Sequence, residues 1–161
     1  MFDIQFLDKE KKKQYAYQTS WGLTTRSIGV LVMMHCDNKG LVLPPKVSPI
    51  QVVIVPIKTS KDDPKQIQEK GEDIFKQLKD AGIRVEFDDN DQHTPGWKYA
   101  HWELKGVPIR IEYGKKDLSQ EQVTFFCRDN FEKFTVKLTE VVGKVKETLD
   151  VIQKRMFKKQ Q

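Results

Sequence analysis

Arg26 is the first residue whose type and position could do chemistry. It follows Thr24 and Thr25 and precedes an apolar run from Ile28 to His35 that has helical spacing. Arg26 therefore lies in the first turn of a predicted helix, where free backbone N–H groups and the positive end of the helix dipole attract anions. Its guanidinium and the threonine hydroxyls could bind a phosphate there. A buried ion pair would account for this arginine equally well.

A second unusual segment, PGWKYAHWE, has four aromatic side chains close together: Trp97, Tyr99, His101 and Trp102. Aromatic rings mixed with a lysine, here Lys98, are typical of surfaces that stack unpaired bases beside a phosphate backbone. On a helix, Tyr99 and Glu103 share one face. By itself the segment is more typical of core packing, and Trp102 is expected in the core.

A predicted strand in GVPIRIEYGKKD carries the third candidate group. Because side chains alternate along a strand, Arg110 and Glu112 point to the face opposite Ile109 and Ile111. Arginine can bind the edge of guanine through two hydrogen bonds, and carboxylates accept from base amino groups. We therefore expect the polar side of this strand, next to Tyr99, to be an open surface for splayed-out nucleotides. The alternative is an exposed face with ordinary ion pairs, which contribute little.

Other chemistries lack their motifs. The chain has no glycine-rich dinucleotide or phosphate loop and no HExxH sequence. The three histidines have no metal-ligand spacing with Cys36 or Cys127, so no metal site is predicted. The two cysteines cannot form a disulfide framework and are expected to be inert thiols of a reduced, cytoplasmic protein.

The composition is that of a folded chain. It has 161 residues, of which 38% are hydrophobic and 32% are charged, enough for one ordinary domain or a small domain plus part of a neighbour. No apolar stretch is long enough to span a membrane, and the N-terminus does not have the pattern of a signal peptide. The net charge of +5 is concentrated towards the two ends of the chain. That distribution would suit a polyanion, although on charge alone we favour a solvated, lysine-rich surface.

The elements that position these residues follow from their periodicity. We expect a hairpin with strands near residues 2–6 and 15–19, followed by a helix that Thr24 or Thr25 caps and that ends at Gly40. This helix is apolar nearly all round, so it is expected to be buried in something large. Pro44 and Pro45 mark a boundary between domains at residues 1–45 and 46–161.

Beyond this boundary the pattern predicts an α/β fold, with one mixed sheet of about five strands flanked by helices. The expected strands are 51–57, 83–87, 107–113, 123–128 and 133–136. The expected helices are 64–81, 97–104 and a final helix capped by Thr139, and a turn is expected at 114–117.

Several of these segments resemble one family. SWGLTTRSIG followed by HCDNKGLVLPP is similar to motif 3 of class II aminoacyl-tRNA synthetases, in the form found in the prolyl-tRNA synthetase family of archaeal and eukaryotic type. QVVIVPI followed by PGWKYAHWELKGVPIRIEYGKKDL resembles the anticodon-binding domain of the same family. The resemblance covers nearly the whole chain and is weakest over residues 58–82 and 129–161.

The resemblance implies two groups of site residues. At the catalytic end, Arg26 would contact ATP phosphate with Thr24 beside it, and the proline pocket would be lined by Ser20, Trp21 and Gly22. At the anticodon end, Tyr99 would stack on a base, and the two guanines shared by proline anticodons would be read by Glu103, Arg110, Lys116 and Asp117. The implied partners are tRNA(Pro), ATP and proline, with Mg²⁺ as the metal of the parent enzyme.

Motifs 1 and 2, and the C-terminal extension with its cysteine cluster, have no counterpart in the sequence. We therefore expect a fragment that has no cofactor of its own and is inactive alone. Its parent would be a homodimer, without membrane association, that ligates proline to tRNA(Pro) through prolyl-adenylate. One alternative is a non-catalytic tRNA- or RNA-binding module with the same fold, against which the intact motif 3 argues. Another is a small α/β nucleotide-binding protein, which would need a glycine-rich loop after Ile57.

Overall fold

A computed structural model of the chain describes residues 3–58 and 64–159. Its internal contacts divide the chain into two compact units, residues 1–31 and 32–161. The division falls within helix α1 (Arg26–His35). By contact, residues 32–45 therefore belong with the second unit, whereas the domain boundary expected after residue 45 stays a prediction.

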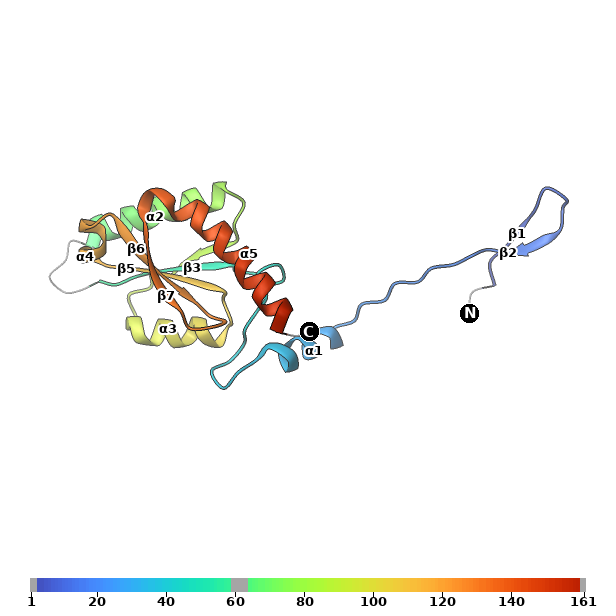
Figure 1. Cartoon of the computed structure of the whole chain (residues 1–161), viewed down its shortest axis with the longest axis horizontal. Helices are drawn as coiled ribbons and strands as arrows, with labels where there is room; N and C mark the ends of the chain where they lie inside the picture. The colour runs from blue at the N-terminus through green and yellow to red at the C-terminus, as the bar shows by residue number, and fades with distance from the viewer. Residues whose placement is uncertain (1–2, 59–63, 160–161) are drawn as a thin grey trace. The chain divides into compact units, whose positions relative to one another are not determined.

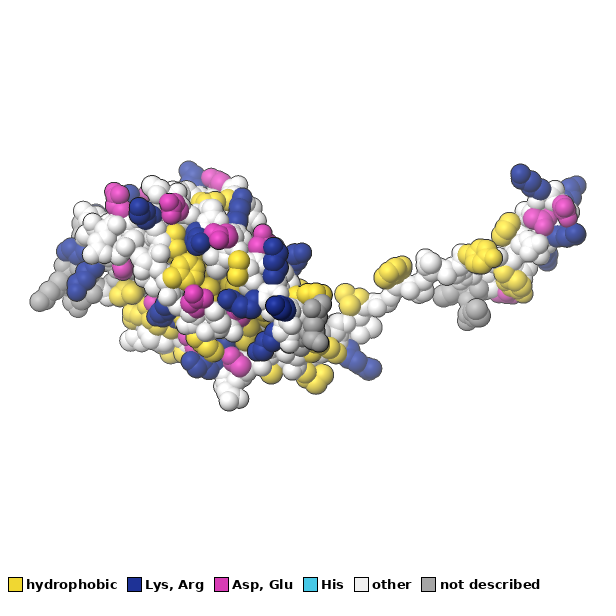
Figure 2. Space-filling view, viewed as in Figure 1, with side chains coloured by type: hydrophobic (Ala, Val, Ile, Leu, Met, Phe, Trp, Pro, Cys, Tyr) yellow, Lys and Arg dark blue, Asp and Glu magenta, His cyan; other side chains and the backbone are white. Residues whose placement is uncertain are grey.

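The first unit contains the expected hairpin. Strands β1 (Gln5–Leu7) and β2 (Lys13–Tyr15) pair antiparallel, and an extended stretch then leads to α1. No residue of α1 is buried within this chain, and its burial in something larger stays a prediction. The described residues do not surround it, and apolar side chains such as Met33 lie exposed. Figure 2 shows further apolar side chains along the extended stretch.

The second unit is built on one mixed sheet, which confirms the predicted fold class (Figure 1). The strand order is β4-β3-β5-β6-β7, in which β4, β3 and β5 run parallel and β6 and β7 are antiparallel. The strands are β3 (Val52–Pro56), β4 (Val85–Phe87), β5 (Ile109–Tyr113), β6 (Gln122–Cys127) and β7 (Lys133–Lys137). The central strand β3 is buried throughout, as its continuous apolar run predicts.

Helices cover both faces of this sheet (Figure 1). Helices α2 (Pro64–Asp80) and α5 (Val141–Lys159) pack on one face and form the larger core, which includes Leu78 and Ile152. Helix α3 (Pro95–Leu104) packs on the other face against Val53 and Val55 of β3. No described helix is long and apolar enough to cross a membrane.

Three local predictions were wrong. The helix expected to end at Gly40 ends at His35, because residues 37–40 form a turn in which the Asp37 carboxylate accepts a hydrogen bond from the backbone N–H of Lys39. The expected turn at 114–117 is the start of a short helix, α4 (Lys115–Ser119), because the Asp117 carboxylate accepts a hydrogen bond from the backbone N–H of Gly114. The final helix begins at Val141 instead of following a Thr139 cap, and Thr139 lies in a 3₁₀ turn (Leu138–Glu140) before it. The apolar stripe of the final helix is buried as predicted.

Candidate nucleic-acid interface

Helix α3 is capped at its start and is bonded to Asp88, the residue that follows β4. At its start, Thr94 accepts a hydrogen bond from the backbone N–H of Trp97, so it caps the helix. Further along, Trp102 Nε1 donates to Asp88 Oδ2 at 2.7 Å, and Lys98 Nζ donates to the Asp88 carbonyl at 2.8 Å. These contacts orient α3 so that Tyr99 lies over the polar side of β5 and β6.

Arg110 is the centre of a cluster on this side of the sheet. Its Nε and Nη2 atoms each lie 2.8 Å from Glu112 Oε1, and its Nη1 lies 3.2 Å from Glu103 Oε1. The guanidinium carbon is 4.2 Å from the ring centroids of both Tyr99 and Phe126, so the group is held between two aromatic rings. The cluster joins α3 to β5 and β6.

The geometry of Arg110 corrects part of the sequence analysis. The side chain points away from the isoleucine face, as alternation predicts. However, it is only 4% exposed and is paired internally, so the expectation of an open guanidinium for base contact is wrong. The physical reason is that Tyr99 and Phe126 cover it and two carboxylates neutralise it. Alternation along a strand identifies a face but not what covers that face.

Tyr99 keeps its hydroxyl proton at physiological pH. Burial, with the negative charges of Glu112 and Asp117 added, raises its pKa to about 12, although the charge of Arg110 opposes this shift. A protonated phenol can donate a hydrogen bond as well as accept one. Because the side chain is only half-buried, part of it is accessible beside the cluster.

The β6–β7 part of the same face is polar and largely accessible. Phe126 pairs with Lys133, and Thr124 pairs with Thr135, so these side chains share the face of Arg110. Lys133 is half-exposed, and its Nζ donates to Glu112 Oε2 at 3.1 Å. Sequence reasoning missed Lys133, although the alternation of the predicted hairpin could have placed it opposite Phe126.

Helix α4, which follows β5, carries two further charged side chains among the predicted anticodon residues. Lys116 is exposed, and Asp117 is partly exposed with one carboxylate oxygen 2.9 Å from Gly114 N. Of the five predicted anticodon residues, Tyr99, Glu103 and Arg110 are thus in contact, and Lys116 and Asp117 lie on the neighbouring helix.

The other aromatic residues of PGWKYAHWE divide between core and surface. Trp102 is buried as expected. Trp97 stacks between His93 and His101, with centroid distances of 3.6 and 4.8 Å, and remains partly exposed. Partial burial, followed by the nearby charge of Lys105, lowers the pKa of His101.

The predicted catalytic residues lie in the first unit and are all exposed: Ser20, Trp21, Gly22, Thr24 and Arg26. Four of them belong to the extended stretch, and Arg26 opens α1 as predicted. The structure of this unit does not gather them into an enclosed site. Among the described residues there is also no group of three His, Cys, Asp or Glu side chains that could hold a metal ion.

The two cysteines differ in their surroundings. Cys36 is exposed, and Cys127 is buried in the sheet. Burial raises the pKa of the Cys127 thiol to about 11, so it stays protonated and inert at neutral pH.

Comparison with known proteins gives a consistent result. Residues 51–148 match a protein family described as "Anticodon binding domain". The chain is 48% identical over 157 residues to a proline–tRNA ligase of Natranaerobius thermophilus, which covers 98% of this chain and 32% of that protein. It is also 45% identical to the bifunctional glutamate/proline–tRNA ligase of Drosophila melanogaster, over all of this chain and 10% of that protein.

A solved structure is similar as well. The crystal structure of prolyl-tRNA synthetase from Cryptosporidium parvum, complexed with L-proline and AMP, matches with a TM-score of 0.89 and 46% identity. The match covers 96% of this chain and 32% of that one. The chain thus spans about a third of the length of the single-function ligases that it resembles.

Proposed function

Because the chain belongs to the anticodon binding domain family, we propose that its second unit binds the anticodon of tRNA(Pro) as part of a proline–tRNA ligase. The parent ligates proline to tRNA(Pro) through prolyl-adenylate, with ATP as the energy source. The observation that carries the proposal is the cluster of Tyr99, Glu103 and Arg110 beside an accessible, polar part of the sheet. The high identity to proline–tRNA ligases over nearly the whole chain supports the choice of tRNA.

The exposed groups around the cluster suit guanine. Carboxylates accept hydrogen bonds from the amino and imino groups of guanine, and lysine donates to its carbonyl oxygen. Glu103 and Asp117 take the first role, and Lys116 takes the second. Tyr99 provides a ring surface and a hydroxyl donor for an unstacked base. Lys133 adds positive charge on the same face, which favours the approach of the phosphate backbone.

Arg110 has a supporting role in this proposal. Its guanidinium is already paired with Glu103 and Glu112 and is covered by the two aromatic rings. It therefore fixes the carboxylate of Glu103 and the ring of Tyr99, and those two groups contact the RNA.

The first unit contributes the motif 3 part of the parent active site. Arg26 and Thr24 bind ATP at its phosphates and adenylate, and Ser20, Trp21 and Gly22 line the proline pocket. The parent is a cytoplasmic homodimer that uses Mg²⁺ with ATP. The described residues hold no set of metal ligands, so no step of this proposal passes through the metal on this chain.

Binding of an anticodon stem-loop RNA tests the anticodon role. The chain is titrated with one RNA that has a proline anticodon and another in which adenine replaces the two guanines. Glu103→Gln and Lys116→Ala are each expected to reduce the preference for the first RNA by ~1–3 kcal/mol, the size of one good base contact. Lys76→Ala, an exposed lysine of α2, is the matched control and should change neither affinity. Equal binding of both RNAs by the unaltered chain would refute anticodon reading.

Pyrophosphate exchange in the full-length ligase tests the role of Arg26. Arg26→Ala is expected to lower proline-dependent exchange at least ~100-fold, as for the loss of one donor to the transition state. Binding of the anticodon stem-loop should be unchanged. An unaltered exchange rate would remove Arg26 from the proposal and leave the anticodon role standing.

A further inference from the structure

An ion pair holds the segment that follows α1 against the sheet. Arg128, just after β6, donates from Nη1 and Nη2 to the two carboxylate oxygens of Asp37 at 2.7 and 2.6 Å. Arg128 is only 1% exposed, so the Asp37 carboxylate takes the place of water around its buried charge. The hydrogen bonds from Arg128 lower the pKa of Asp37 to about 2. Both residues belong to the second unit.

The segment held by this pair runs alongside the end of α3. The backbone N–H of Leu41 donates to the Leu104 carbonyl at 3.0 Å, and that of Leu43 donates to the Gly106 carbonyl at 3.1 Å. The approach is close, because a Cβ atom added at Gly40 would lie 2.6 Å from Leu104 Cα. Residues 37–43 and the end of α3 are thus one tightly packed structure.

Arg128 also contacts the predicted anticodon residue Glu103. Its Nε donates to the Glu103 carbonyl at 3.0 Å, while the Glu103 carboxylate accepts from Arg110. Glu103 is therefore fixed at its backbone by one arginine and at its side chain by another. The two guanidinium groups line the same narrow recess as Glu103, together with Phe126.

We propose that Asp37 and Arg128 are positioning residues for anticodon discrimination, because their pair holds Glu103 in the orientation that reads a base. The inference rests on the proposed function and extends it. Asp37 lies outside residues 51–148, which match the anticodon-binding family. The working anticodon unit therefore includes the segment that follows α1, and this segment continues directly from the helix that begins with Arg26.

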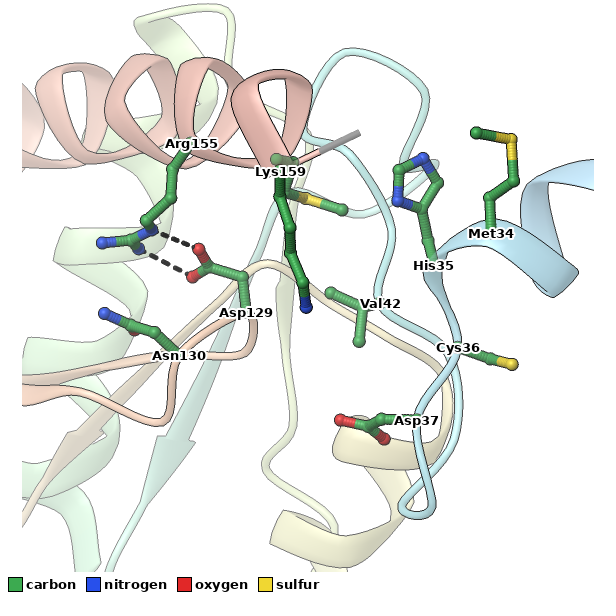
Figure 3. A pocket seen from close by; sticks show the side chains of 10 residues that line it. Met34, His35, Cys36, Asp37, Val42, Asp129, Asn130, Arg155 and Lys159 are labelled. Carbon is green, nitrogen blue, oxygen red and sulfur yellow. Dashed lines mark hydrogen bonds and ion pairs between the residues drawn. The ribbon is translucent and has the colours of Figure 1, made fainter. Parts of the chain in front are cut away.

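Two conservative variants remove the pair with little change in volume. Asp37→Asn keeps the shape but not the charge, and Arg128→Lys keeps the charge but cannot make two parallel hydrogen bonds while also reaching the Glu103 carbonyl. The control is Asp129→Asn. Asp129 makes an equivalent two-bond pair with Arg155 of α5 (Figure 3), a helix that packs on the sheet face opposite α3. Asp37, Asp129 and Arg155 line one surface pocket, in which Asp37 belongs to the segment that follows α1.

The test measures discrimination between RNAs with the full chain. The anticodon stem-loop with the proline anticodon and its adenine-substituted form are titrated against each variant, and circular dichroism checks folding. Asp37→Asn and Arg128→Lys are each expected to lose about tenfold of the preference for the proline anticodon, within the range of one base contact. Asp129→Asn should keep the full preference.

The outcomes separate this inference from the function on which it rests. If the unaltered chain does not prefer the proline anticodon, anticodon reading fails and the inference fails with it. If the unaltered chain discriminates and both variants discriminate equally well, only the positioning role is refuted. An equal loss of affinity for both RNAs would also refute it, because the pair would then support the fold alone. Should Arg128→Lys not fold, Asp37→Asn, which leaves Arg128 in place, decides the question.

Discussion

Replacing Arg110 with alanine should lower the free energy of unfolding of the second unit, and this loss should exceed the binding free energy of any single RNA contact. The change removes ion pairs to Glu103 and Glu112, a hydrogen bond to the Tyr99 carbonyl, and two cation–π contacts. Breaking a buried pair from one side typically costs ~3–5 kcal/mol, because the remaining charge stays buried without its partner.

The structure indicates the lower end of this range. Glu112 keeps its hydrogen bond to Lys133 after the change. Glu103 is 18% exposed at its side chain, so water can solvate part of its charge. We therefore expect a loss of ~3 kcal/mol in the free energy of unfolding, where breaking of a buried pair dominates.

Urea unfolding, followed by circular dichroism, measures this loss. The double variant R110A/E112Q is the control, because it also removes the buried carboxylate charge that Arg110 neutralises. It should recover at least ~1 kcal/mol relative to Arg110→Ala, since neutralising a buried carboxylate that has lost one of its two charged partners removes much of its desolvation penalty. A loss below ~1 kcal/mol for Arg110→Ala, the value typical of an exposed pair, would refute the buried cluster as a source of stability.

Three further changes test other parts of the structure. Gly71→Ala should destabilise the fold by ~1–3 kcal/mol through overpacking, because the added Cβ would lie 2.1 Å from the Tyr113 hydroxyl; a neutral effect in urea unfolding would contradict this packing. Arg128 lowers the pKa of Asp37 to about 2, so the pair contributes to the free energy of unfolding above pH 4. This contribution should be lost as the pH falls towards 2, and the Asp37→Asn variant should not show that loss. The pKa of Tyr99 is raised to about 12, so between pH 10 and 12 the unfolded chain releases a proton that the folded chain retains. The free energy of unfolding should therefore fall as the pH rises through this range. Tyr99→Phe should reduce this fall when unfolding is measured across the same range.

The main elements of the second unit could be predicted from local patterns. The apolar run at 51–57 predicts a central strand because a strand covered on both faces needs apolar side chains throughout. The helix over 64–81 follows from its amphipathic spacing, and it is found as Pro64–Asp80. The hairpin of β6 and β7 follows from alternation on either side of Asp129 and Asn130.

Packing between distant segments could not be predicted in the same way. Nothing local to Arg110 indicates that Phe126 would cover it from the next strand or that Glu103 would reach it from α3. The pairing of Arg128 with Asp37 joins residues 91 positions apart, and neither residue was a candidate site residue. Such contacts depend on the strand order, which sequence periodicity does not specify.

The two kinds of positive charge on the anticodon face explain why burial of Arg110 is compatible with RNA binding. A guanidinium that is stacked between two rings and bound to two carboxylates carries no net attraction outward, because Glu103 and Glu112 neutralise it at short range. The ammonium groups of Lys116 and Lys133 lie further out, where they are accessible to solvent. Salt dependence of RNA binding should therefore follow these lysines, since each contact with a phosphate releases a counterion. Discrimination between bases should instead follow Glu103, whose orientation the two buried arginines determine.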